Sequence, residues 1–161
     1  MALDTRAFRD ALGCYPTGVA VITAESADRP PMGITVNSFA SVSLDPPLVL
    51  WCVDRRSDRF KTFSAARGFT VSVLAATHGG VSARLARPGA HALDGIPLAA
   101  TVLGPPALAD ALAVFECVRE WAHEGGDHLI LVGRVERFSR RPAGAPLIFF
   151  RGRYGTVAGP G

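Results

Sequence analysis

The run GITVNSFASVSLDPP at residues 33–47, continued by LVLWCV at residues 48–53, carries the most information about the architecture. It reads as a strand over Met32–Asn37, a turn of small polar residues, and an apolar strand over Leu48–Val53 that two prolines introduce. Short β segments bounded by Ser, Asp and Pro are typical of a β-rich domain with many turns.

Further strands are expected on both sides of this run. Gly18–Ala24 forms a hairpin with Met32–Asn37 across the turn Ala27–Pro31, and later strands cover Phe69–Leu74, Leu112–Trp121, His128–Phe138 and the region around Leu147–Phe150. Short helices are expected over Asp4–Tyr15, Asp58–Ala66 and Val81–Ala86. Because strands and helices do not alternate regularly, we predict a mainly β fold with short helices, a barrel rather than a doubly wound sheet.

Composition narrows the class of protein. The 161 residues suffice for one domain, which we expect to span residues 1–161 with a core at about 6–157, and the 48% hydrophobic content excludes disorder. The net charge of +3 comes from scattered arginines, so we expect no nucleic-acid partner. No apolar run approaches the roughly 18 residues that cross a bilayer, and no signal peptide is evident, so we expect a cytoplasmic protein without a membrane partner.

Residues 33–47 also point to a ligand. No glycine-rich dinucleotide or P-loop motif is present, so a bound nucleotide needs another architecture. Small side chains allow a planar ligand, such as a flavin ring, to lie against backbone N–H and C=O groups. The alternative from composition alone is a Ser/Thr-rich turn that satisfies its own backbone. The small polar residues concerned are Thr35, Asn37, Ser38, Ser41 and Ser43.

Four segments, taken together, resemble the flavin reductase family. They are YPTGVAVITA (15–24), GITVNSFASVSLDPPLVLWCVDRRS (33–57), GDHLILVGRV (126–135) and FRGRYG (150–155). The resemblance covers about residues 6–157, with the motifs in order and at the family's spacing. It implies an FMN-binding split β-barrel with Greek-key-like connections, found in reductase components of two-component aromatic monooxygenases.

The resemblance also implies the flavin contacts. The ring would lie beside Ile34, Thr35, Val36, Asn37 and Ser38, with Ser41 and Val42 closing over it, and the strand Trp51, Cys52 and Val53 would face the ring and ribityl chain. Ser57, in a turn before a helix, would receive the phosphate, as helix N-termini favour anions. Additional positive charge would come from Arg59, where the family often has Thr, and from Arg87, with Arg55, Arg56 and Arg84 as further candidates.

A second predicted site lies at Asp127 and His128. The resemblance implies that His128 contacts the nicotinamide cofactor, and His128 is the catalytic candidate. Without the resemblance, a histidine at a strand end is more often structural. Tyr154 would lie near the mouth of the cofactor site, where an aromatic ring can stack on the ligand. The alternative is that Tyr154 is a surface residue at the end of a strand. We expect no metal site, because His123 and His128 are separated by Gly125-Gly126, which cannot continue the helix that an HExxH motif needs.

The expected function is therefore an NADH- or NADPH-dependent flavin reductase that reduces FMN or FAD and supplies it to a partner flavin-dependent oxygenase. The expected chemistry is hydride transfer, for which the protein provides positioning. One alternative is an FMN-binding electron-transfer or sensor module that retains its flavin; another is a split-barrel enzyme that reduces a different substrate. A homodimer is expected, because apolar strands of a small barrel leave an exposed face.

Overall fold

The structure is a computed structural model that describes residues 3–26 and 29–157. Its longer strands are β2 (Ala20–Ser26), β3 (Arg29–Val36), β4 (Ala40–Leu44), β5 (Pro47–Asp54), β6 (Gly68–Val73), β9 (Ala113–Gly125) and β10 (His128–Arg140). The shorter ones are β1 (Thr17–Gly18), β7 (Leu98–Ala99), β8 (Ala107–Leu108), β11 (Ile148–Phe150) and β12 (Arg153–Gly155). The helices are α1 (Thr5–Leu12), α2 (Phe60–Ala65) and α3 (Gly79–Leu85), with a 3₁₀ turn, η1 (Ala76–His78).

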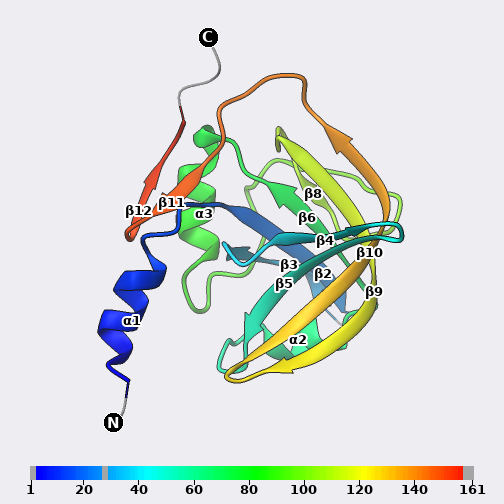
Figure 1. The fold of residues 1–161 in the computed structure, drawn as a ribbon. Helices are drawn as coiled ribbons and strands as arrows, with labels where there is room; N and C mark the ends of the chain where they lie inside the picture. The colour runs from blue at the N-terminus through cyan, green and yellow to red at the C-terminus, as the bar shows by residue number, and fades with distance from the viewer. Residues whose placement is uncertain (1–2, 27–28, 158–161) are drawn as a thin grey trace.

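Seven antiparallel strands form one curled sheet in the order β3-β2-β6-β9-β10-β5-β4 (Figure 1). The connection from β5 to β6 passes over β9 and β10, which gives the Greek-key-like path. The sheet curls until the end of β3 meets β5: the Cys52 N–H donates to the Ser38 hydroxyl at 3.0 Å, and that hydroxyl lies 3.4 Å from the Cys52 carbonyl. This arrangement confirms the mainly β, split-barrel prediction.

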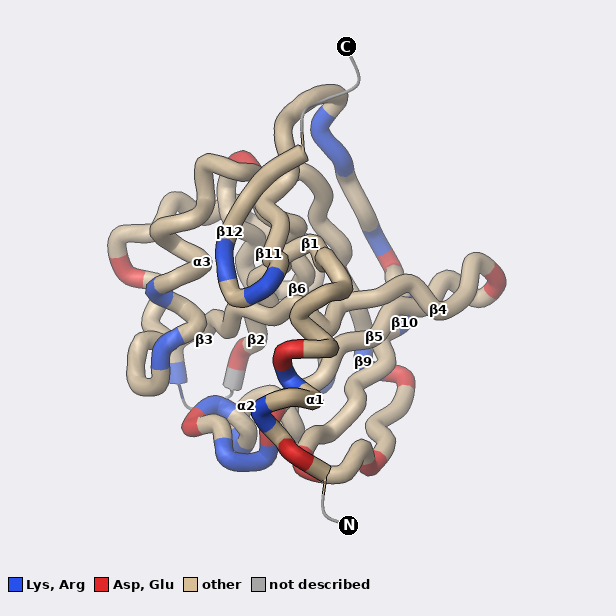
Figure 2. Tube along the Cα trace, turned by 60° about the vertical axis from the view of Figure 1, so that its left-hand side comes forward, with Lys and Arg blue, Asp and Glu red and all other residues tan. Residues whose placement is uncertain are grey.

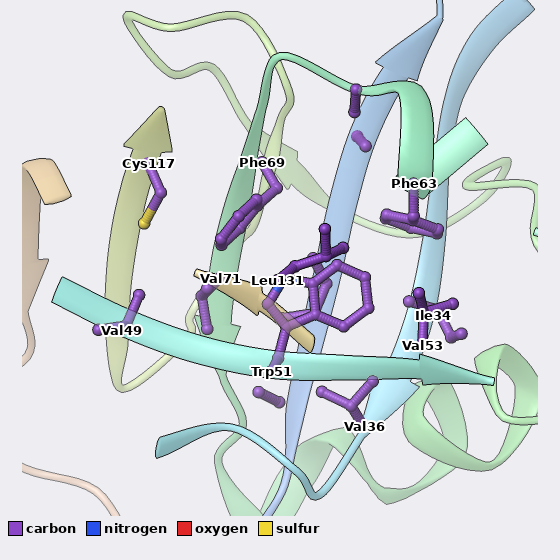
Figure 3. Packing of buried hydrophobic residues seen from close by; sticks show 14 of the residues in the cluster. Ile34, Val36, Val49, Trp51, Val53, Phe63, Phe69, Val71, Cys117 and Leu131 are labelled. Atoms are coloured by element: carbon purple, nitrogen blue, oxygen red, sulfur yellow. The ribbon is translucent and has the colours of Figure 1, made fainter. Parts of the chain in front are cut away.

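The interior of the curled sheet is a continuous apolar core around Trp51 (Figure 3). The Trp51 ring contacts Phe63 and Phe69 edge to face, with centroid distances of 5.2 and 5.7 Å. Burying side chains of this size stabilises a fold by about 1.5–3 kcal/mol each. Gly133 is required here, because a Cβ at that position would lie 2.4 Å from the Phe69 ring.

A second apolar cluster attaches α3 to the outer face of β2 and β3. It joins Val21 and Leu85, both fully buried, to Leu93 in the long loop after α3. A Cβ on Gly33 would lie 2.9 Å from Leu93 and 3.1 Å from Leu85, so glycine lets α3 pack closely against β3. This packing places α3 directly beside the residues predicted to bind the cofactor.

Several local expectations need correction. The first helix ends at Leu12 rather than Tyr15, because after Gly13 the chain continues in turns from Cys14 N–H to the Ala11 carbonyl and from Tyr15 N–H to the Leu12 carbonyl. Ala40–Leu44, read as part of a turn because of its serines, is the strand β4 at the edge of the sheet. Of the expected turn at Ala27–Pro31, residues 29–31 belong to β3, which begins at Arg29, and residues 27–28 lie outside the described residues.

Helix α1 projects from the body of the molecule (Figure 1), and its apolar side chains are exposed. Asp4 caps it by accepting from the Arg6 and Ala7 N–H groups. Figure 2 shows basic and acidic residues dispersed along the chain. Within residues 3–26 and 29–157, no helix has the length and apolar character needed to cross a membrane.

Candidate functional site

The predicted site begins at the free edge of β3. The Gly33 N–H points away from β2 and donates to the His91 carbonyl at 2.9 Å. Alternation along the strand therefore turns the backbone N–H and C=O of Thr35 toward the same open side. A cavity of about 190 Å³ lies there, lined by Val19, Thr35, Val36, Asn37, Ala86, Phe149 and Tyr154.

Strand alternation separates the predicted contacts on β3 and β5 into two sets. Ile34, Val36, Trp51 and Val53 belong to the barrel core, and Trp51 and Val53 are fully buried. Cys52 lies between two of them, faces the outside and is half-buried, and this burial raises the pKa of its thiol. The inward residues can therefore reach a ligand on the outer face chiefly through their backbone. The side chains of Thr35 and Cys52 lie on that outer face, and of the two only Thr35 lines the cavity.

Arg59 links the turn that contains Ser57 to the end of α3, where Arg87 follows the helix. The Ser57 hydroxyl accepts from the Arg59 N–H at 3.2 Å, which leaves its own O–H free to donate. The Arg59 guanidinium is 3% exposed and donates to the backbone carbonyls of Leu85, at 3.0 Å, and of Arg87. The Asp58 carboxylate adds a further link between this turn and the loop after α3 by accepting from the Gly89 N–H.

These bonds distinguish the predicted cations from one another. Arg55 is paired with Glu124 and lies over the Phe60 ring, and Arg84 donates to loop carbonyls. Arg59 is engaged with the end of α3. Arg87 is exposed, and its guanidinium has no hydrogen bond or ion pair with any side chain or carbonyl in the described part of the chain. Arg87 is thus the predicted cation most available to an anionic ligand.

Arg56 forms an ion pair with Asp54 at the end of β5. Its guanidinium donates to both carboxylate oxygens of Asp54, at 3.3 and 3.0 Å, and its N–H donates at 2.8 Å. Hydrogen bonding from Arg56 lowers the pKa of Asp54 to about 2. Asp54 is therefore ionised at neutral pH and keeps Arg56 paired.

His128 lies opposite Asp54, at the start of β10. Its neighbours Leu129 and Leu131 are buried in the core, so alternation places the His128 side chain on the outer face with Cys52 and Asp54. The ring Nδ1 lies 2.7 Å from an Asp127 carboxylate oxygen, and this hydrogen bond lowers the pKa of Asp127. With Nδ1–H directed at Asp127, Nε2 remains available to a ligand.

Tyr154 reaches the site from the last strand, β12. Its hydroxyl lies 2.8 Å from the Ser82 hydroxyl, and its ring meets Phe149 at a centroid distance of 5.7 Å. The hydroxyl of Thr35 donates to the Ser82 carbonyl at 2.8 Å. Sequence reasoning gave no role to Ser82 or Phe149. The partners of Ser82, Thr35 and Tyr154, lie 47 and 72 residues away along the chain, so no local pattern reveals these contacts.

Not every predicted residue lines this cavity. Ser41 and Val42 lie exposed on β4, and Ser38 is engaged in closing the barrel against β5. A larger hollow of about 490 Å³ lies at the opposite end of β3, between Arg29–Met32 and the loop 91–98. Because it contains none of the predicted cofactor residues, we centre the candidate site on the smaller cavity.

The comparisons with known proteins agree on one family. The flavin reductase like domain matches residues 12–158. The chain is 47% identical over 155 residues to FMN reductase (NADH) SmoA of Agrobacterium fabrum, covering 96% of this chain and 87% of the relative. It is 39% identical over 154 residues to HsaB, the reductase subunit of a flavin-dependent monooxygenase in Mycobacterium tuberculosis, covering 94% of this chain and 82% of the relative.

The solved structures point the same way. The NADH:FAD oxidoreductase SgcE6 of Streptomyces globisporus, in complex with NAD and FAD fragments, superposes with a TM-score of 0.91 at 36% identity, covering 97% of this chain and 94% of that one. The match to the domain extends over nearly the whole chain, and the fold is shared with that neighbour. This chain therefore belongs to the flavin reductase family.

Proposed function

We propose that this chain uses NADH or NADPH to reduce FMN or FAD and supplies the reduced flavin to a flavin-dependent oxygenase component. The observation that carries the proposal is the open β3 edge beside a cavity that the predicted residues Thr35, Asn37 and Tyr154 line. Three further predicted residues lie outside that cavity: Ser57 and Arg87, which Arg59 contacts through its N–H and its guanidinium respectively, and His128 on β10, the strand next to β5. Relatives named as NADH-dependent FMN and FAD reductases support the assignment of both co-substrates.

The residues present fit a flavin. The β3 edge offers N–H and C=O groups of Thr35 for the polar edge of a flat ring, with Tyr154 and Phe149 as aromatic neighbours. The Ser57 O–H and the Arg87 guanidinium supply a donor and a positive charge for a phosphate. The cavity of about 190 Å³ is smaller than the roughly 300–1,000 Å³ of enclosed cofactor sites. A flavin would lie partly on the open surface, which favours its release.

A bound flavin supplies the redox chemistry, taking up a hydride from the nicotinamide and a proton from solvent. The chain supplies binding and orientation. Thr35 and the β3 edge hold the ring, Ser57 and Arg87 hold the phosphate, and His128, fixed through Nδ1 by Asp127, contacts the nicotinamide nucleotide. Positioning of two reactants in this way can replace a bimolecular encounter with an intramolecular one.

The second copy of the chain is the other proposed partner. The apolar residues Phe8, Leu12 and Tyr15 at and just after α1 are 49, 59 and 76% exposed, and Leu44 at the end of β4 is 94% exposed. Such surfaces on a small domain usually mark contacts, so we propose a homodimer. Light scattering should give twice the 16.9 kDa of one chain, and a stable monomer at micromolar concentration would contradict the proposal.

We also propose that the protein works in the cytoplasm, where thiols stay reduced. Cys14, Cys52 and Cys117 are all free. Fusion of the chain to a fluorescent protein, followed by cell fractionation, would test this location.

Steady-state oxidation of NADH and NADPH, with FMN, FAD and riboflavin varied in turn, tests the proposed function. We expect oxidation that depends on added flavin and saturates with it. Flavin that co-purifies tightly, together with negligible NAD(P)H oxidation, would instead support the electron-transfer or sensor module.

A further inference from the structure

Ser82 connects the two walls of the proposed flavin cavity. It lies in α3, is completely buried, and uses two different polar groups. Its carbonyl accepts from the Thr35 hydroxyl on β3 at 2.8 Å, while its hydroxyl lies 2.8 Å from the Tyr154 hydroxyl on β12. Thr35 and Tyr154 both line the cavity, whereas Ser82 does not. Ser82 therefore links the two walls by hydrogen bonds.

Tyr154 has few other restraints. Its strand, β12, has only three residues and pairs with β11 outside the seven-stranded sheet, where both lie beside α3 (Figure 1). The side of the Tyr154 ring meets Phe149, and the residue as a whole is 41% exposed. The hydrogen bond to Ser82 is the contact that joins Tyr154 to a fully buried residue. Without it, the ring could turn outward toward solvent.

We propose that Ser82 is a positioning residue for flavin binding: it holds the Tyr154 ring at a fixed distance from the β3 edge, so that a flat ring fits between them. The proposal rests on the function proposed above. Ser82 acts through Tyr154 and does not itself contact the ligand. The alternative is that the bond only fastens the end of the chain to the barrel.

Ser82→Ala separates these roles because it removes only the hydroxyl. The Ser82 carbonyl, and hence the bond from Thr35, remains in place. Ser72→Ala is a matched control: Ser72 is also completely buried, and its hydroxyl accepts from the Leu108 N–H at 3.0 Å, but it does not line the cavity. Both variants lose one buried serine hydroxyl, so both should lower Tm.

The measurement is a fluorescence titration of the full chain with riboflavin and with FMN. Ser82→Ala should raise Kd for both ligands by roughly 2- to 12-fold, the equivalent of one hydrogen bond, since the ring is common to them. Tyr154→Phe should do the same, and the double variant should be no weaker than either single variant. Ser72→Ala should leave both Kd values unchanged, and kcat at saturating flavin should stay the same in Ser82→Ala.

An unchanged Kd in Ser82→Ala would overturn the inference alone, provided that the wild-type chain binds flavin. A Kd raised equally in Ser72→Ala, or additive losses in the double variant, would also overturn it, since the effect would then be general loosening or two independent contacts. A wild-type chain that binds neither riboflavin nor FMN would overturn the proposed function and this inference together.

Discussion

Replacing Ser57 with aspartate should weaken FMN binding while sparing riboflavin. The Ser57 side chain already accepts from the Arg59 N–H at 3.2 Å, and an aspartate carboxylate can accept the same bond, so the turn before α2 should still fold. The variant places a negative charge where we propose that the flavin phosphate binds. Riboflavin has the same ring and ribityl chain without a phosphate, so it reports every effect except the charge repulsion.

The size of the effect follows from the exposure of the site. Two unit charges about 4 Å apart repel by about 1 kcal/mol in bulk water and about 4 kcal/mol at an effective dielectric constant near 20. Ser57 is half-buried at the surface, so a value between these limits, about 2 kcal/mol or roughly 30-fold in Kd for FMN, is expected. The loss should shrink as salt is added, because exposed charges are screened.

Fluorescence titrations with FMN and riboflavin, at low and high salt, measure this difference. Ser57→Asn is the uncharged control of similar shape. Ser64→Asp adds the same charge at the far end of α2, away from the proposed phosphate. Equal losses for FMN and riboflavin, or an equal effect of Ser64→Asp, would refute the placement of the phosphate at Ser57.

Three further predictions concern the surroundings of the site. His128→Ala should raise KM for NAD(P)H or slow flavin reduction by roughly 5- to 150-fold, with little change in flavin Kd. Stopped-flow measurement of flavin reduction, together with a flavin titration, checks this. A variant with both a lower Tm and weaker flavin binding would show that the role of His128 is structural. Arg59→Met should lower the free energy of unfolding by about 2–4 kcal/mol, because the buried guanidinium satisfies carbonyls at the end of α3; an unchanged urea midpoint would contradict this. The pKa of the Asp54 carboxyl, measured by NMR, should be about 2, below its ordinary 3.8. The contribution of the Asp54–Arg56 pair to the free energy of unfolding is therefore complete above pH 3.8 and is lost as the pH falls through about 2. Arg56→Gln should return that pKa toward 3.8, and an unshifted value in the wild type would show that the pair does not persist in solution.

Local patterns made most of the strands predictable. Residues 48–53 are continuously apolar after two prolines, and β5 occupies that run with one further residue at each end. Strand β4 escaped prediction because its serines read as turn residues, whereas pairing with β5 determines its conformation. Alternation alone could have shown that Trp51 and Val53 share one face and Cys52 lies on the other, while the fold shows that the first face is the interior.

The rest of the site depends on contacts between distant parts of the chain. Arg59 was predicted as a phosphate contact, yet its guanidinium is buried against the carbonyls of residues 85 and 87, which no local pattern reveals. The Ser82–Tyr154 bond joins positions 72 residues apart. The sequence therefore predicted the segments from which the candidate site is built, while the contacts of individual side chains required the fold.

Anaerobic reduction followed by ultrafiltration tests the central claim most directly. The chain is mixed with excess NADH and with FMN or FAD in large molar excess over protein, and the filtrate is assayed for reduced flavin. A flavin reductase that releases its product should yield reduced flavin in the filtrate far exceeding the amount of protein, at a rate proportional to protein concentration. Reduction limited to one flavin per chain, with none in the filtrate, would contradict the account.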